Sequence, residues 1–207
     1  MAARDKTSPH MPWYAGPTVL DLLDTLEKAP SPVDRPLRLP VQDVYKFTED
    51  GDDRRIVAGR IETGRLRVGD EVVFLPSGKR SRIRSVESFP PGSKQQARAG
   101  ESTGVTLETQ VYVKSGELMV RRDELPPRSS TRLEANLFWL SPNPMVMGKR
   151  YKLKLHAARA AAYLTKVHAV IDASDLSTVA NRRQIERHDV AHVTLEKGER
   201  SELAELA

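Results

Sequence analysis

Cysteine is absent from this chain of 207 residues, which excludes disulfide bonds, thiolate metal sites and a cysteine nucleophile. Aromatic residues make up only 5% of the sequence, so its cores must be built mainly of aliphatic side chains. No apolar run reaches the roughly 20 residues that a membrane-spanning helix needs. The polar start, residues 1–6, also lacks the apolar segment of a signal peptide. We therefore expect a soluble cytoplasmic protein with no membrane partner.

Positive charge is in modest excess, with a formal net charge of +5, which raises the question of a polyanionic partner. Basic and acidic residues are interspersed along most of the chain, and the one dense basic run covers residues 79–84. There Lys79, Arg80, Arg82 and Arg84 are separated by Ser81 and Ile83, a pattern typical of the solvated face of a half-buried strand. Nucleic-acid binding is accordingly the less favoured interpretation of this run.

One helix is expected near the start of the chain. Thr18 precedes apolar residues at positions 19, 20, 22, 23 and 26, which is helical spacing, and Asp21 and Asp24 lie near the positive end of the helix. Pro30 and Pro32 follow it and indicate a linker. The helix has no core of its own and must pack on something else.

Short strands separated by glycine turns are expected from residue 36 to about residue 126. Their ranges are 37–44, 56–61, 68–75, 82–89, 104–107, 110–113 and 116–120, with a charged loop at 49–53. Gly59, inside a strand, indicates a bulge or a close backbone approach. The regular spacing of strands and turns predicts a closed or nearly closed antiparallel barrel.

A second β unit follows Leu125-Pro-Pro127. Four strands are expected there, at residues 131–140, 151–156, 162–171 and 189–195, and the charged tail 198–207 reads as frayed. Four strands are few for a sheet that must close on itself. The sequence therefore predicts an incomplete barrel.

No GTP-binding motif is found. Gly78-Lys79-Arg80 and Gly148-Lys149-Arg150 lack both the earlier glycine and the hydroxyl residue of a P-loop, and no Asn-Lys-x-Asp run is present to read guanine. We predict that these residues bind no GTP.

The histidines offer a weak metal-site signal. His188 and His192 have the spacing of a zinc-binding helix, but Val190, Val193 and Leu195 fit a strand better. We interpret the pair as structural, and His156 and His168 as packed side chains or exposed neighbours.

The remaining candidates form no catalytic set. Carboxylates occur in loops and turns, at positions 50, 52, 53, 172 and 175, and Ser141 and Ser174 lack a nucleophile-elbow context. The aromatic pairs at 13–14 and 138–139 favour core or domain contacts. We predict no catalytic, cofactor-binding or metal residue in this chain and no activity of its own.

Several segments together resemble a known family. Leu39-Pro-Val-Gln-Asp-Val44, Val57-Ala-Gly-Arg-Ile-Glu-Thr-Gly64 and Val68-Gly-Asp-Glu-Val72 are similar to the second-domain barrel of elongation factor Tu, as are Leu75-Pro-Ser-Gly78 and Ala99-Gly-Glu-Ser102. Residues 11–23 resemble the segment that ends the GTPase domain in this superfamily. Residues 138–144, 151–155 and 170–174, with the Leu75-Pro-Ser-Gly78 turn, favour the sulfate adenylyltransferase large subunit over a translation factor.

The resemblance covers residues 11 to about 196 and implies an organisation. Residues 1–35 would be the end of a GTPase domain and a linker, residues 36–126 a domain 2-like barrel, residues 127–197 a partial domain 3-like barrel, and residues 198–207 a tail. GTP and Mg²⁺ would belong to the GTPase domain, which has no counterpart in these residues. The family's third domain usually continues past strand 193–195, so we expect a fragment, a split product or a short relative.

The resemblance also implies a role without active-site groups. In the family the large subunit couples GTP hydrolysis to adenylation of sulfate by a partner subunit. The expected partners are therefore the sulfate adenylyltransferase small subunit and a separate GTPase domain, with the barrels serving as a docking or regulatory scaffold. The alternative is a translation-factor-like module that binds RNA or a protein. The open strands and the exposed helix further predict dimerisation or aggregation of the isolated chain.

Overall fold

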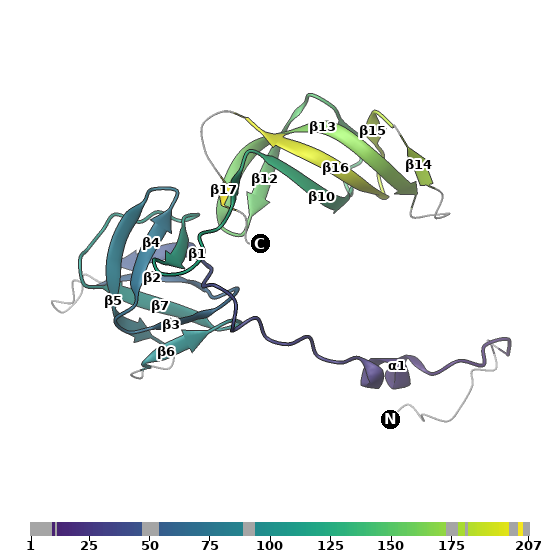
Figure 1. The fold of residues 1–207 in the computed structure, drawn as a ribbon. Coiled ribbons are helices and arrows are strands. Elements are labelled where there is room, and N and C mark those ends of the chain that lie inside the picture. Colours follow the sequence, from purple (N-terminus) through teal and green to yellow (C-terminus); the bar gives the residue numbers. More distant parts are fainter. Residues whose placement is uncertain are drawn as a thin grey trace. The chain divides into compact units, whose positions relative to one another are not determined.

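The computed structural model describes residues 10, 12–46, 54–88, 94–172, 178–180, 182–198 and 203–204. Contacts divide the chain into two units, 1–31 and 32–207. Strands dominate the second unit, which confirms the all-β prediction (Figure 1). The predicted loop at 49–53, the strand end at Phe89, Ser174, Asp175 and nearly all of the tail lie outside the described residues.

The first unit contains the predicted helix, α1 (Val19–Thr25). Thr18 is its N-cap: the Asp21 backbone N–H donates to Thr18 Oγ1, and the Thr18 backbone N–H donates to the Asp21 carboxylate, which forms a reciprocal capping box. The helix ends where Leu26 turns to extended backbone. With seven residues α1 is far too short to cross a bilayer, and the described part of the chain has no other helix that could.

The second unit begins with a closed barrel. Its strands follow the order β1-β2-β7-β5-β4-β8, with every neighbouring pair antiparallel. The bounds are β1 (Leu39–Lys46), β2 (Arg55–Arg60), β4 (Glu71–Leu75), β5 (Lys79–Glu87), β7 (Ser102–Leu107) and β8 (Leu118–Arg121). A separate two-stranded antiparallel sheet pairs β3 (Arg65–Arg67) with β6 (Gln96–Arg98).

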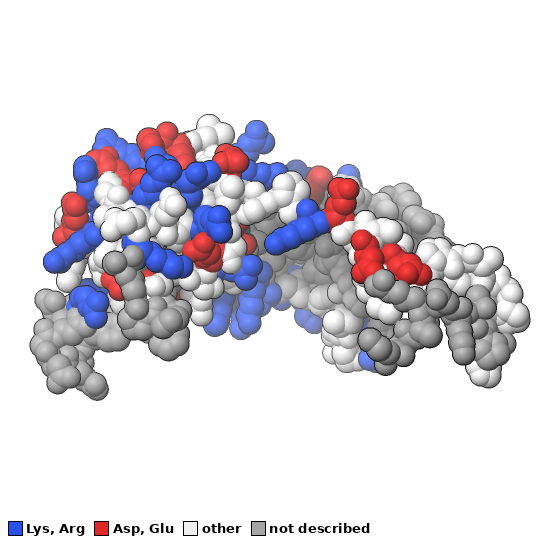
Figure 2. Space-filling model, turned by 90° about the horizontal axis from the view of Figure 1, so that it is seen from below, with Lys and Arg blue, Asp and Glu red and all other residues white. Residues whose placement is uncertain are grey.

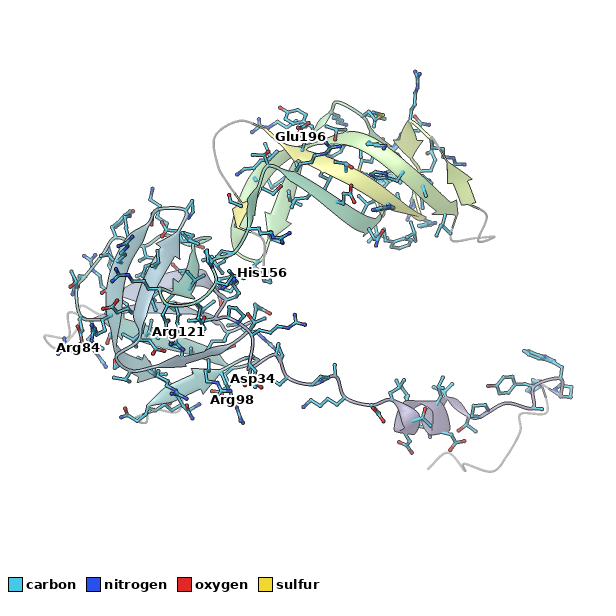
Figure 3. All side chains as sticks on the ribbon, viewed as in Figure 1. Asp34, Arg84, Arg98, Arg121, His156 and Glu196 are labelled. Atoms are coloured by element: carbon cyan, nitrogen blue, oxygen red, sulfur yellow. The ribbon has the colours of Figure 1, made fainter. Side chains whose placement is uncertain are left out.

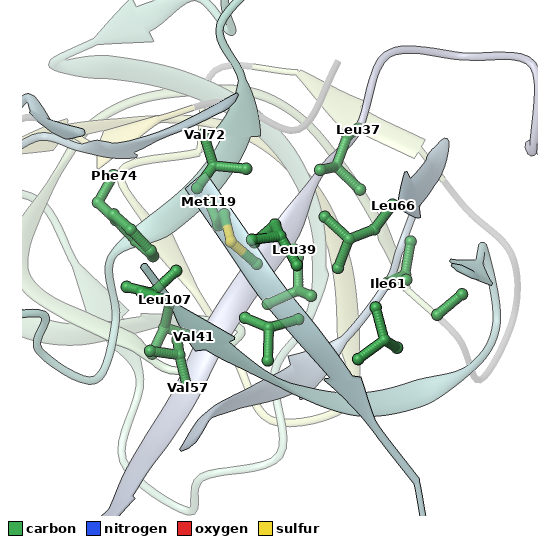
Figure 4. Packing of buried hydrophobic residues seen from close by; sticks show 14 of the residues in the cluster. Leu37, Leu39, Val41, Val57, Ile61, Leu66, Val72, Phe74, Leu107 and Met119 are labelled. Carbon is green, nitrogen blue, oxygen red and sulfur yellow. The ribbon is translucent and has the colours of Figure 1, made fainter. Parts of the chain in front are cut away.

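The barrel interior is filled by aliphatic side chains and Phe74, as Figure 4 shows. Leu39, Val41, Ile83 and Met119 are fully buried and come from three different strands, β1, β5 and β8. Alternating strand residues point to opposite faces, so closing the sheet directs one set from every strand to a common centre. This burial of apolar surface provides the main stabilisation of the barrel.

Gly59 permits the close approach that its sequence position indicates. A Cβ there would lie 2.3 Å from the Pro40 carbonyl oxygen. Opposite it, β1 is irregular between Val41 and Asp43, which pair with Gly59 and Ala58. The predicted close backbone approach at Gly59 is confirmed, whereas the extra residue of the ladder lies on the partner strand, at Gln42 of β1.

Arg38 ties the chain's entry into the barrel to its exit. Its buried guanidinium donates to the carbonyls of Leu37 and Leu125, while the Leu37 backbone N–H donates to the Glu124 carboxylate. Burial lowers the pKa of Arg38, and the charge of Glu124 offsets part of this effect. Polar contacts therefore connect the segment just before β1 to the segment just after β8.

One predicted strand of the barrel is wrong. Residues 110–113 form no strand, although Val111 and Val113 pack against the core. The Tyr112 carbonyl instead accepts from Lys79 Nζ. Apolar alternation there reflects packing, and the neighbouring barrel strands already use both of their edges with one another, so the segment has no ladder to join.

The C-terminal part forms an open sheet. Its order is β10-β16-β13-β12, with β14 also paired to β13. The bounds are β10 (Arg132–Phe138), β12 (Arg150–Leu155), β13 (Ala158–Asp172), β14 (Thr178–Ala180) and β16 (Asp189–Lys197). All four predicted strands are present, although β13 is longer than expected. The sequence did not predict β14 or the short pairs β11 (Met145–Val146) with β15 (Gln184–Ile185) and β9 (Ser129–Ser130) with β17 (Leu203–Ala204).

A second core lies on one face of this sheet. Leu164, Val193 and Ile185 are fully buried there, and Trp139 packs edge-on against Tyr151 with ring centroids 5.8 Å apart. The Tyr151 hydroxyl accepts from the Val146 backbone N–H at 2.8 Å. Aromatic side chains thus supplement the aliphatic core where the sheet does not close.

Candidate functional site

The histidines are separated by the fold and do not form a zinc-binding helix. His188 lies in a turn with φ +74° and stacks on Phe138, whereas His192 lies on β16 and stacks on His168 at 4.6 Å between ring centroids. His156, expected at the end of a strand, occupies the turn between β12 and β13 with φ +51°. Among the described residues no group of three or more His, Asp or Glu side chains is placed to hold a metal ion.

The stacked pair His168–His192 belongs to a polar cluster on the outer face of the sheet. The Nε2 atoms of both rings lie 3.9 Å from Glu134 carboxylate oxygens. His168 Nε2 also forms a 2.8 Å hydrogen bond with Thr194 Oγ1, which is fully buried. The cluster therefore links β10, β13 and β16 through side chains.

Strands β12 and β13 carry a group of cations on one face of the sheet. Arg150, Lys152 and Lys154 alternate with residues that face the core, and Lys154 pairs in register with Arg159. Within the described ranges none of these four side chains has a carboxylate partner. We call Arg150, Lys152, Lys154 and Arg159 the β12–β13 cationic face.

A shallow hollow accompanies this face. Its volume is about 470 Å³, and its lining combines three of the cations with Tyr151 and the small residues Ala160 and Ala161. Small side chains leave the guanidinium and ammonium groups accessible, and the clustering of positive charge without carboxylates favours anions. The face can therefore bind a phosphate backbone or an acidic protein surface.

The basic run of the barrel is different because Arg82, at its centre, is paired with carboxylates. As predicted, β5 exposes Arg80, Arg82 and Arg84 and buries Ile83. Arg82 donates to Glu71 at 2.8 Å, and Arg122 donates to the other oxygen of the same carboxylate at 2.9 Å. These hydrogen bonds lower the pKa of Glu71, and the one from Arg122 has the largest effect. Figure 2 shows basic and acidic side chains intermingled over the barrel.

Helix α1 offers an apolar surface. None of its residues is buried, and Val19, Leu20, Leu22 and Leu23 are each between 46 and 74% exposed. Aliphatic side chains at this spacing on an otherwise unpacked helix mark an interaction surface. The sequence predicted this helix and its need for a partner.

The β12–β13 cationic face was not predicted as a unit. In the sequence Lys152 and Lys154 alternate with apolar residues, a pattern that indicates a solvated strand face, but Arg159 joins them only through the hairpin register. The short connection at 156–157 between two strands was the available signal, because an antiparallel hairpin places residues flanking its turn side by side.

Two family models match the chain. Elongation factor Tu domain 2 matches residues 54–110, and the GTP-eEF1A C-terminal domain-like family matches residues 132–201. The first match covers β2 to β7 of the barrel, and the second covers the open sheet from the start of β10 to beyond the end of β16.

Relatives that match most of the chain include translation factors and a sulfate-activating subunit. Elongation factor 1-alpha of Staphylothermus marinus is 35% identical over 80% of this chain and 37% of its own length. Sulfate adenylyltransferase subunit 1 of Shewanella oneidensis is 33% identical over 81% of this chain and 34% of its own length. This chain thus spans little more than a third of either relative.

Solved structures confirm the fold. A crystal structure of sup35 complexed with GDP superposes with a TM-score of 0.71 and 18% identity, over 97% of this chain and 48% of that one. At this identity the likeness concerns the fold alone.

Proposed function

Because the chain is built of an elongation factor Tu-like domain 2 and an eEF1A-like C-terminal domain, and so belongs to the elongation factor Tu-like family, we propose that it is a non-catalytic docking scaffold in GTPase-coupled sulfate activation. Its partners are a GTPase domain, which binds GTP and Mg²⁺, and the small subunit of sulfate adenylyltransferase. The proposal rests on the sulfate adenylyltransferase relative and on the motifs at residues 138–144 and 170–174. A cytoplasmic location belongs to the same proposal.

The exposed apolar stripe of α1 is the observation that carries a docking role. The capped helix exposes four aliphatic side chains to water. A partner that buried one of them completely would gain on the order of 1.5–3 kcal/mol of binding free energy from that side chain. The surrounding segment, residues 11–23, resembles the end of a GTPase domain. We therefore assign the GTPase domain as the partner that covers α1.

A binding experiment with the full chain tests this assignment. The chain is immobilised and offered a GTPase domain and a sulfate adenylyltransferase small subunit, first separately and then together. The double substitution Leu20→Glu and Leu23→Glu should weaken capture of the GTPase domain about 10-fold or more, because it places charges in the apolar contact. Glu27→Gln, directly after the helix, should leave capture unchanged.

Adenosine phosphosulfate formation provides the second readout. A rise in product when this chain is added to the two partners would support the scaffold. If neither partner is captured by a chain whose circular dichroism and thermal transition are those of a folded protein, the scaffold proposal fails.

A second candidate is a translation-related module that binds RNA. It is favoured by the β12–β13 cationic face and by relatives such as elongation factor 1-alpha of Aeropyrum pernix, 36% identical over 80% of this chain. Three or four phosphate contacts predict a loss of affinity of about 40- to 150-fold between 50 and 200 mM salt.

Transfer RNA is the probe for this candidate. Lys152→Ala with Lys154→Ala should reduce both the affinity and its salt dependence, whereas Arg80→Ala on the barrel should change neither. Binding that is equally strong in the double variant, or no binding at 50 mM salt, would remove the RNA candidate and leave the scaffold untouched.

A further inference from the structure

A cavity of about 370 Å³ opens at the end of the barrel where β2 begins and β7 ends. Cationic side chains are contributed by Arg54, Arg55 and Arg84. Apolar surface is contributed by Val57, Leu107, Val44 and Val111. The volume falls within the range of pockets that bind small molecules. The cavity therefore has one charged wall and one apolar wall, and its volume can hold a small ligand.

Arg84 lies at a β-bulge. In the β5–β7 ladder Ile83 pairs with Leu107 and Ser85 with Thr106, so Arg84 is the extra residue between them. A bulge bends its strand and redirects side chains, and bulges are frequent at barrel rims and beside functional sites. Arg84 is exposed like Arg80 and Arg82 on the same strand, and its side chain lines the cavity (Figure 3).

Positive charge exceeds negative charge around the cavity. Among the described residues Glu87 is the only carboxylate in its lining, and its oxygens already contact Arg54 Nη1 at 3.8 Å and accept from Ser85 Oγ at 2.6 Å. Arg55, which is half-buried, and Arg84 have no hydrogen-bond or ion-pair partner in the part of the chain that the structure describes. Two guanidinium groups are thus left to bind an anion, for which their planar forks are well suited.

The apolar wall restricts the kind of anion. Val57 and Leu107 are buried core residues whose side chains also line the cavity, and Val111 packs on the same core. An inorganic anion would leave this wall in contact with water, whereas an organic group would cover it. Ser85, Thr106 and Gln110 add hydrogen-bonding groups between the two walls.

We propose that this barrel-end cavity binds an organic phosphate or sulfate ester no larger than a mononucleotide. The charged ester group contacts Arg55 and Arg84, and the organic body lies against Val57, Leu107 and Val111. This site is separate from α1 and from the β12–β13 cationic face, so it stands independently of the proposed docking role.

Isothermal titration calorimetry on the full chain tests the site with three probes: adenosine 5′-monophosphate, 4-nitrophenyl sulfate and inorganic phosphate. We expect one saturable site for at least one of the two esters, and binding of inorganic phosphate about 10-fold weaker or more. Arg55→Gln and Arg84→Gln should each weaken ester binding about 10-fold, the range expected for losing one charge-assisted contact.

Arg80→Gln is the matched control. Arg80 lies on the same strand, is exposed and does not line the cavity. Its variant should bind the ester within about twofold of the unaltered chain, and thermal unfolding verifies that all three variants remain folded.

Three results would overturn the proposal: no saturable binding of either ester at millimolar concentration, equal affinity for inorganic phosphate, or equal losses in the Arg80 and Arg84 variants. If only Arg55→Gln fails to fold, Arg84→Gln still decides the outcome, because Arg84 is exposed and supports no described contact.

Discussion

The barrel and the open sheet of this chain use the same alternation of apolar and polar residues but complete their hydrogen bonding differently. Each of the six barrel strands pairs on both sides, so the described barrel leaves no long strand edge free. In the open sheet β10 and β12 pair on one side only. The difference shows that alternation selects the buried face of a strand, whereas the ladder partners decide whether a sheet closes.

The two regions also place their charges differently. On the barrel Glu71 binds Arg82 and Arg122, whereas along the edge strand β12 three cations follow one another without an opposing carboxylate among the described residues. Lysine and arginine along an edge discourage pairing with another chain. Charge therefore serves as edge protection in the region that lacks closure.

The largest expected effect concerns the barrel core. Phe74→Ala should lower the free energy of unfolding by about 3–5 kcal/mol, because the side chain is fully buried and its removal leaves a cavity. Phe138→Ala in the sheet, where the ring is 51% exposed, should cost no more than about 1 kcal/mol. Urea unfolding followed by circular dichroism measures both. Equal losses would show that the barrel interior is not the better-packed region.

The second largest difference in stability between the two regions should come from a backbone contact in the barrel. Gly59→Ala brings a Cβ against the Pro40 carbonyl and should cost about 3 kcal/mol, the upper end for overpacking. Gly148→Ala in the sheet meets nothing within 4 Å and changes only a residue at φ +74°, which costs about 1 kcal/mol. The same unfolding experiment compares them. A larger loss at Gly148 would contradict the close approach in the barrel.

Association should reveal whether the cations of β12 protect the edge of the sheet. Replacing Lys152 and Lys154 of β12 by Val should raise the fraction of dimer or larger species in size-exclusion chromatography with light scattering, because the edge would lose its cations. Replacing Arg80 and Arg82 by Val on β5, which is paired on both sides, should have a much smaller effect. Comparable association of both variants would assign aggregation to surface hydrophobicity in general.

The smallest effect is a pH dependence in the barrel. Folding lowers the pKa of Glu71 below its ordinary value of 4.5, so its ion pairs stabilise the fold above that pH. This contribution is lost as the pH falls through the lowered pKa. Glu71→Gln should therefore be slightly less stable than the unaltered chain at pH 7, and the difference should shrink below about pH 4.

Glu196 of the sheet provides the control for this measurement. It is exposed on β16 (Figure 3) and has no ion-pair partner among the described residues. Because Glu196→Gln removes no described ion pair, it should change the free energy of unfolding at pH 7 less than Glu71→Gln does. A difference for Glu71→Gln that stays constant from pH 7 to pH 3 would show that its ion pairs contribute nothing measurable.

Several features were predictable because they depend on local chemistry. Helix α1 begins after Thr18, with Asp21 in its first turn, as the sequence predicts, Gly59 permits the close approach of β1, and the run 79–84 forms the exposed face of β5. Others depended on distant partners. Residues 110–113 alternate like a strand but have no ladder to join, and Arg159 joins the cations of β12 only through the hairpin register.

The sequence by itself determined the all-β class, the helix near the start of the chain, the position of most strands and the family resemblance, because these follow from residue type and short-range spacing. Only the tertiary structure decided which sheet closes, which cations lose their carboxylate partners and where the bulge at Arg84 lies. These properties arise from pairing between segments far apart in the chain. Such pairing is set by the total packing and hydrogen bonding of the fold, which no local pattern contains.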